Sequence, residues 1–208
     1  MTPTADHGPA ARRLAGLLAA IPDSAPAMPT PCPDMDLAAL LDHVHGLSIA
    51  FAMAAAKDRP EGGSPPPSAA AANLAPDWRV RIPAALDALA AAWRVPGARE
   101  GTTEAGGIEM PGDVAASVAL NEIVVHGWDV ARATGQPYDA GTDEVEACLA
   151  FVGPSVEESG GAGIEGLFGP AVAVPADAGP LDRLIALTGR DPAWTPPHGS
   201  PVRRTPAP

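Results

Sequence analysis

Two side chains on one helical segment have the types and spacing of a metal-ligand pair. Glu122 and His126 lie four positions apart in LNEIVVHGWDVARATG, residues 120–135. On a helix this spacing puts both on one face, with about 5–6 Å between their Cβ atoms. A carboxylate and an imidazole suit Zn²⁺ best, and Ni²⁺, Co²⁺, Fe²⁺ or Mn²⁺ also accept such donors. The pair predicts a site for one divalent metal ion. The alternative is a surface ion pair that binds no metal.

The neighbours of this pair suggest open space and a supporting carboxylate. Ala115, Ala119 and Ala133 fall on the same helical face, and such small side chains would leave room beside the two donors. Asp129 lies almost one turn beyond His126. It is expected either to orient the imidazole of His126 or to pair with Arg132.

A catalytic metal site needs a third protein ligand and an open position for water or substrate. His43 and His45, both in the segment LLDHVHG, are the candidates. Each lies on one flank of the apolar stripe of its predicted helix, so helical period does not choose between them. His7 and His198 lie in the terminal segments and are poor candidates.

Hydrophobic periodicity predicts the elements that would position these residues. Five helical segments and a short sixth are expected: about 9–21, 36–57, a segment through Ile82 and Trp93 with Pro83 at its start or at a kink, 111–135, a segment capped by Thr142, and 180–189. Residues 58–76 are predicted as an exposed loop, residues 95–112 have room for a short hairpin, and residues 167–180 are expected to be extended. This pattern predicts an all-α bundle, and an up-down-down-up order would use the loop at 58–76 as its long crossover.

Composition argues against several classes of function. The net charge is −12, Lys57 is the single lysine, and no basic cluster is present, so nucleic-acid binding is disfavoured. No apolar run reaches the roughly 18 residues of a membrane span, and the leucines near the N-terminus follow helical spacing better than a signal-peptide pattern. Cys32 and Cys148 match no zinc or disulfide framework. We therefore expect a cytoplasmic protein that acts on a small molecule, as a monomer or homodimer.

Three sequence blocks together resemble the actinobacterial metal-binding branch of the DinB-like superfamily. The blocks are PTPCPDMDLAALLDHVHG, ALNEIVVHGWDVARATG and FGPAVAVPADAGPLDRLIALTGRDPAW. This branch is close to the N-terminal domain of mycothiol-dependent maleylpyruvate isomerase. The resemblance implies one domain over residues 1–195, a DinB-like antiparallel four-helix bundle with a short hairpin or extended segment and a small C-terminal helix. Residues 196–208 are expected to be a Pro-rich disordered tail.

The resemblance also selects the third ligand. In the family, a histidine follows the cysteine of the Pro-Cys-Pro turn by eleven residues, and counting from Cys32 gives His43. The implied metal ligands are therefore His43, Glu122 and His126. His45 becomes a residue of the pocket edge or of helix packing, and with Asp129 a candidate helper.

The activity implied by the resemblance is a metal-dependent transferase or isomerase, with mycothiol as the thiol cosubstrate and a metal-activated water or thiol as the reacting group. Arg79, Arg81 and Arg132 are the sequence candidates for binding an anionic substrate. Met35 replaces the aromatic residue usual in the family, and no counterpart of the isomerase's C-terminal domain follows, so maleylpyruvate isomerisation itself is not the expected reaction. The alternatives are a non-catalytic metal-binding bundle that serves as a sensor or carrier, and a biosynthetic enzyme that uses the metal as a Lewis acid without a thiol.

Overall fold

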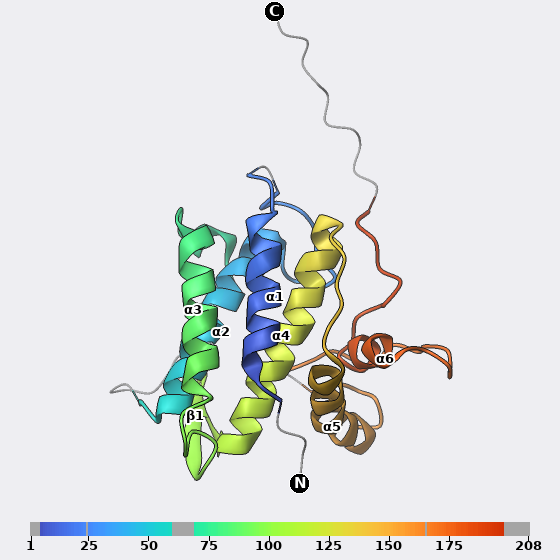
Figure 1. Ribbon diagram of the computed structural model, residues 1–208. Coiled ribbons are helices and arrows are strands. Elements are labelled where there is room, and N and C mark those ends of the chain that lie inside the picture. Colours follow the sequence, from blue (N-terminus) through green and yellow to red (C-terminus); the bar gives the residue numbers. More distant parts are fainter. Residues whose placement is uncertain (1–4, 24, 60–68, 165, 198–208) are drawn as a thin grey trace, which may run out of the picture.

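The computed structural model describes residues 5–23, 25–59, 69–164 and 166–197, and it confirms the all-α expectation (Figure 1). The elements of this described part, in chain order, are α1 His7–Ala19, α2 Leu37–Ala56, the short 3₁₀ helix η1 Ala71–Asn73, α3 Trp78–Ala92, β1 Thr102–Ala105, β2 Ile108–Pro111, α4 Gly112–Thr134, α5 Thr142–Glu158 and α6 Pro180–Leu187. The predicted tail lies almost wholly outside the described residues, as does His198.

Helices α1 to α4 form a four-helix bundle in which α1 and α2 each pack against both α3 and α4. Arg79 at the start of α3 donates to Ile21 O beyond the end of α1, so these two helices are antiparallel. Lys57 at the end of α2 donates to Ala98 O just past α3, so α2 and α3 are parallel. His7 at the start of α1 donates to Ala116 O near the start of α4. The order is therefore up-down-down-up, and the chain from α2 to α3 must return along the bundle; residues 60–68 of that connection are not described.

Local side chains set the helix ends. The carboxylates of Asp6 and Asp36 accept from Gly8 N and Ala39 N, and they cap α1 and α2. Helix α1 therefore begins two residues before the predicted Pro9. Gly135 ends α4 with a φ of 68°, in the left-handed region that glycine adopts without strain, as predicted.

Two predicted boundaries differ in detail. Pro83 lies inside α3, several residues after the helix start at Trp78, so it does not begin the helix. Gly141, and not Thr142, is the N-cap of α5. The reason is Glu144, whose carboxylate accepts from Gly141 N at 2.9 Å and does the capping from within the helix.

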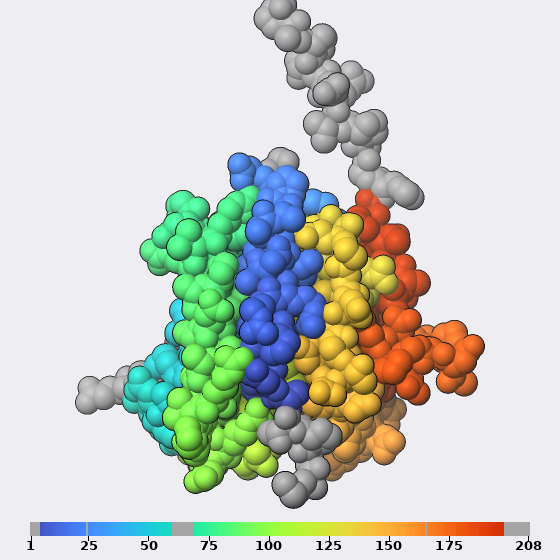
Figure 2. All heavy atoms as spheres, in the orientation of Figure 1, coloured from blue at the N-terminus to red at the C-terminus, as the bar shows by residue number. Residues whose placement is uncertain are grey.

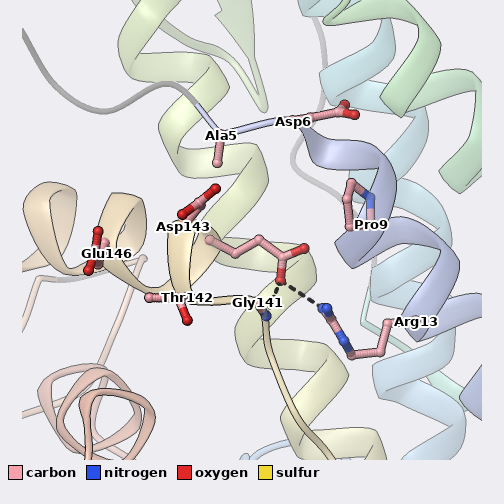
Figure 3. A pocket seen from close by; sticks show the side chains of 9 residues that line it. Ala5, Asp6, Pro9, Arg13, Gly141, Thr142, Asp143 and Glu146 are labelled. Atoms are coloured by element: carbon pink, nitrogen blue, oxygen red, sulfur yellow. Dashed lines mark hydrogen bonds and ion pairs between the residues drawn. The ribbon is translucent and has the colours of Figure 1, made fainter.

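The same carboxylate joins α5 to the bundle. Arg13 of α1 and the backbone N–H of Gly141, both labelled in Figure 3, donate to the Glu144 carboxylate. Arg13 donates to Glu144 at 2.8 Å across an open depression between the first helical turns of α1 and α5. In Figure 2, α1 forms the middle of the visible face, with α3 on one side and the segment from α4 to α5 on the other.

The predicted hairpin and C-terminal helix are present. Strands β1 and β2 pair antiparallel, with Thr103 opposite Met110, and the Thr103 hydroxyl ties the hairpin to Ala54 O at the end of α2. The last described segment covers the outer side of α4, where Val125 and Trp128 pack against Ile185 of α6. Residues 167–180 form no strand in the described part, and a backbone bond from Val172 N to Ala186 O holds them to α6.

By length and composition α2 is apolar enough to cross a membrane, and its most apolar window is 56% buried inside the protein. Its apolar side chains form the middle of the bundle, where Leu40, Leu41 and Val44 are fully enclosed. Such burial is typical of a helix in the core of a bundle.

Candidate metal centre

Three potential metal-binding side chains meet between α2 and α4. The Oε2 atom of Glu122 lies 3.1 Å from Nε2 of His126 and 3.5 Å from Nε2 of His43. One ligand atom from each residue can be chosen so that all three lie within 4.8 Å of one another. The two imidazole rings meet edge to face, with centroids 5.0 Å apart. The structure thus brings together the three residues that the resemblance selected.

The bundle fixes these positions from both sides. His43 stands in the second turn of α2, whose start is set by the Asp36 cap and by the preceding Pro-Cys-Pro turn. In that turn the Thr30 hydroxyl donates to Met35 O at 2.7 Å and accepts from Cys32 N. Glu122 and His126 lie midway along α4, which packs against α2.

Asp129 supports the site from behind. Its Oδ2 accepts from His126 Nδ1 at 2.9 Å, and its side chain is fully buried. This is the first of the two predicted roles; the guanidinium that pairs with Asp129 is that of Arg190, at 3.1 Å, and not that of Arg132. With one proton of His126 held on Nδ1 by Asp129, Nε2 points toward Glu122, and a metal ion that displaced the Nε2 proton would find the lone pair in the orientation that a ligand needs.

The surroundings of the three donors favour a cation. Burial by itself would lower the pKa of His126, but hydrogen bonds from the imidazole to Asp129 and Glu122 raise it to about 9. Burial would raise the pKa of Glu122, yet His126 and His43 hold it well below its usual range. Two ionised carboxylates that stabilise a proton on His126 would also stabilise a divalent ion between the imidazoles.

The spacing of the donors fits one ion. Zinc bonds of about 2.0–2.2 Å place two tetrahedral ligands of the same ion about 3.4 Å apart. The distances of 3.1 and 3.5 Å from Glu122 to the two imidazoles bracket this value. Two nitrogen donors and one carboxylate are also the ligand set of many catalytic zinc sites, which keep a further position for water or substrate.

A pocket of about 800 Å³ opens above the donors. It is bounded by α2, α4 and α5, the hairpin and the link from α5 to α6, and it includes His43, Glu122 and His126 in its lining. The exposed fraction of the three side chains rises from 6% for His126 through 14% for Glu122 to 20% for His43, so the site faces this opening.

The pocket does not follow the alanine face that the helical wheel suggested. Ala115 and Ala119 are fully buried in the bundle core, and Val118 lies on the pocket side of α4, one turn before Glu122. The space beside the donors therefore lies between α2, α4, the hairpin and the link from α5 to α6, and the three alanines do not line it.

The three arginines proposed for an anionic substrate hold the scaffold together and do not line the pocket. Arg79 binds Asp23 and lies over the Trp78 ring, Arg81 pairs with Asp77, and Arg132 donates to Pro192 O. His45 is likewise outside the pocket lining. It lies close enough to Asp77 to act on its charge: the pKa of Asp77 is lowered mainly by Arg81 and to a smaller extent by His45.

Arg190 is the arginine of the pocket, and the sequence argument did not select it. It lies just after α6, lines the pocket, and binds Asp129 as well as Thr188 O. Burial alone would lower the pKa of Arg190, but Asp129 raises it, so the guanidinium stays charged. The available signal was its place in the third block, LTGRDPAW, where an arginine directly follows a helix-ending glycine.

Cys32 also lines the pocket, and burial raises the pKa of its thiol. Cys32 and Cys148 are both free thiols, in agreement with the absence of a disulfide framework. At neutral pH the Cys32 thiol therefore stays protonated, and it is a poor candidate for a nucleophile.

Comparison with known proteins gives a consistent family assignment. Two proteins of Mycobacterium tuberculosis, named "Uncharacterized protein Rv0738" in strain H37Rv and "Uncharacterized protein MT0763" in strain CDC 1551, are each 28% identical to this chain over 194 residues. Each alignment covers 91% of this chain and 98% of the relative. No solved structure matches the chain. The family model of the mycothiol maleylpyruvate isomerase N-terminal domain matches residues 7–131, more than half of the chain and all three candidate ligands, so the protein belongs to this family.

Proposed function

We propose that the protein binds one divalent metal ion, zinc by preference, through His43, Glu122 and His126, and that it is a metal-dependent transferase or isomerase acting on a small molecule. The observation that carries the proposal is the convergence of three donors from two helices at a pocket of about 800 Å³. A site that held a metal for structure alone would be closed by protein ligands and packed side chains. The pocket lining around these donors favours a site to which a second molecule has access.

The residues around the donors have separate tasks in this proposal. Asp129 keeps the proton of His126 on Nδ1 and fixes the orientation of its ring. Arg190 neutralises Asp129, which would otherwise be a fully buried carboxylate with a single partner. The apolar walls exclude water from the bound molecule, which strengthens every charge interaction at the donors.

A divalent ion held there would supply Lewis acidity, which polarises a carbonyl or lowers the pKa of a thiol. The family name points to mycothiol as the source of that thiol. We propose mycothiol as the cosubstrate, and the same reaction without a thiol is the alternative that an assay distinguishes.

The first test is metal content. The purified full-length protein is expected to carry close to one divalent ion per chain by elemental mass spectrometry, and His43→Ala and His126→Ala are expected to lose it. His45→Ala is the matched control, because it removes a histidine from the same helix outside the pocket. Metal content that is unchanged in His126→Ala would remove the proposed site.

The second test is turnover. Candidate small electrophiles and isomerisable acids are incubated with the metal-loaded protein, with and without mycothiol, and product is followed by mass spectrometry. Product that requires both mycothiol and His126 supports the thiol-dependent reaction. Product that requires His126 alone supports a Lewis-acid enzyme, and ligand binding without product supports a non-catalytic carrier.

A further inference from the structure

The pocket above the three donors has walls made mostly of hydrocarbon. Its sides come from the bundle, the hairpin and the C-terminal segment, and they include Leu47, Phe51, Met110, Val118, Phe151 and Phe168. Its volume lies within the range of about 300–1,000 Å³ that is usual for small-ligand sites. The walls thus offer a bound molecule dispersion contacts and removal from water, and few hydrogen bonds.

The rim of the pocket is apolar as well. Ile108 of β2 is 63% exposed, while Val114 of α4 and Leu167 of the link from α5 to α6 are each 38% exposed. All three line the same pocket although they come from three separate elements. Large apolar side chains gathered at the edge of a site, each partly in water, are positioned to cover the apolar part of a ligand.

Polar partners inside the pocket are few. Apart from the three donors, the charged side chains that line it in the described part of the chain are Asp34 and Arg190, and Ser155 and Cys32 add one hydroxyl and one thiol. Arg190 is already bound to Asp129 and Thr188 O, and the hydroxyl of Thr188 donates to Ile185 O. A ligand rich in hydroxyl groups would leave most of them without partners against hydrocarbon, which is unfavourable.

We propose that this pocket takes a small molecule with an apolar body, alkyl or aryl, and a single metal-ligating head group such as a carboxylate, thiol or hydroxamate. The head group reaches the ion between His43, Glu122 and His126, and this part rests on the proposed function. The body lies against the walls around Phe51 and Phe151 and under the rim at Ile108. A sugar-like body gains no such contacts from these walls, so the sugar part of mycothiol would extend past the rim into solvent while its thiol reaches the ion.

The proposal is tested with a series of hydroxamates, whose head group chelates divalent metals. Acetohydroxamate, butanohydroxamate, hexanohydroxamate and octanohydroxamate are titrated into the zinc-loaded full-length protein by calorimetry. Burial of each added methylene is expected to raise affinity about three- to fourfold until the pocket is full. Gluconohydroxamate, which has a chain of similar length with hydroxyl groups, is expected to bind no tighter than acetohydroxamate.

Wall variants locate the effect. Phe151→Gln and Ile108→Gln place an amide on the wall and on the rim, and each is expected to flatten the dependence on chain length while acetohydroxamate affinity stays the same. Val80→Gln is the matched control, because Val80 is 71% exposed on α3 and does not line the pocket. Folding of each variant is checked by thermal melting. An equal loss in Val80→Gln would place the alkyl chain elsewhere and overturn the proposal.

The apolar body is tested separately from the metal. A fluorescent apolar probe, N-phenyl-1-naphthylamine, is bound to the metal-free protein and displaced with octanoate or hexanol. Zinc binding with affinity independent of chain length overturns the apolar body and leaves the proposed function standing. No zinc binding, together with displacement that Phe151→Gln abolishes, overturns the metal site and supports the apolar pocket. Neither zinc binding nor displacement overturns both.

Discussion

At the scale of single residues, the site depends on a carboxylate that is not itself one of the three donors. Asp129 is fully buried between His126 Nδ1 and the Arg190 guanidinium. Such a partner fixes the imidazole tautomer and raises its basicity as a ligand. Asp129→Asn keeps the shape of the side chain but removes its charge, so zinc affinity is expected to fall about 10–100-fold in a competition titration with a chelator.

The control for this change is Asp113→Asn, on the exposed first turn of the same helix. It alters the net charge of the protein equally and leaves the pocket untouched. Equal loss of zinc affinity in both variants would mean that the effect comes from overall charge and not from the orientation of His126.

His7 gives a pH prediction that is independent of the metal site. It is buried at the start of α1, donates to Ala116 O, and lies face to face with the Trp93 ring. Burial lowers the pKa of His7 from 6.5 to about 4 in the folded protein. Between these two values the unfolded chain binds a proton that the folded chain does not, so the stability from neutral His7 is present above pH 6.5 and is lost as pH falls toward 4.

The loss in the free energy of unfolding is roughly 3 kcal/mol between pH 6.5 and pH 4, at 1.36 kcal/mol for each pKa unit. His7→Gln keeps a donor for Ala116 O but does not titrate. Urea unfolding is measured for the unchanged protein and for His7→Gln from pH 7 to pH 4. The difference between their free energies of unfolding is expected to narrow or reverse as pH falls. Parallel curves over the whole range would contradict the buried neutral state of His7.

The residues of the site were partly predictable from sequence. Helical spacing found Glu122 and His126 and both roles considered for Asp129, because all of these lie within one element. It left His43 and His45 equivalent, since the direction of each depends on how α2 packs against α4, and the family resemblance made that choice. Arg190 could not be inferred, because its contact with Asp129 joins residues 61 positions apart through the docking of the C-terminal segment.

At the scale of elements, one glycine shows how closely the connection from α4 to α5 lies against the helix that carries the site. A Cβ atom at Gly127 would come within 2.8 Å of the Tyr138 hydroxyl. That hydroxyl donates to Val124 O at 2.7 Å, which pins the connection onto α4. Gly127→Ala is expected to displace Tyr138 and to lower the free energy of unfolding by about 1–3 kcal/mol, as overpacking does.

Gly16→Ala is the matched control, since Gly16 is an exposed glycine of α1 with no atom within 4 Å of the added Cβ. This change is expected to stabilise the protein by about 0.5–1 kcal/mol through helix propensity alone. The free energies of unfolding of both variants are to be measured by urea denaturation. A stabilising Gly127→Ala would show that Tyr138 yields at little cost, and that the connection is held more loosely than its hydrogen bond indicates.

Periodicity predicted where the helices lie, and their ends were predicted correctly where the capping group is close in sequence. Asp36 and Gly135 mark the ends of α2 and α4 as predicted, because a cap acts on the few residues beside it. The prediction of Thr142 as the cap was wrong because the Glu144 carboxylate accepts from Gly141 N instead. Arg13, on another helix, also donates to this carboxylate and helps to hold it there. The bundle followed from the apolar stripes, whereas the position of the pocket depended on how the hairpin and the C-terminal segment stand beside α4.

At the scale of the whole molecule, the three donors connect parts of the chain that are far apart. His43 belongs to α2 and the Glu122–His126 pair to α4, and these helices pack against each other in the bundle. An ion held by all three would therefore bind the folded protein and not the unfolded chain. By mass action it would stabilise the fold by about 2.7 kcal/mol at a free zinc concentration one hundred times the dissociation constant.

In a protein of this size, 1 kcal/mol corresponds to a shift of about 2–4 °C in melting temperature. Zinc is thus expected to raise the melting temperature by roughly 5–11 °C relative to the protein in EDTA, measured by calorimetry. His126→Ala should abolish the shift, and His45→Ala should keep it, since His45 lies on α2 near His43 but does not line the pocket. With a net charge of −12, the surface could attract zinc without the site. A shift retained in His126→Ala and suppressed by added salt would assign the stabilisation to that surface, because buried donors are screened far less than exposed carboxylates.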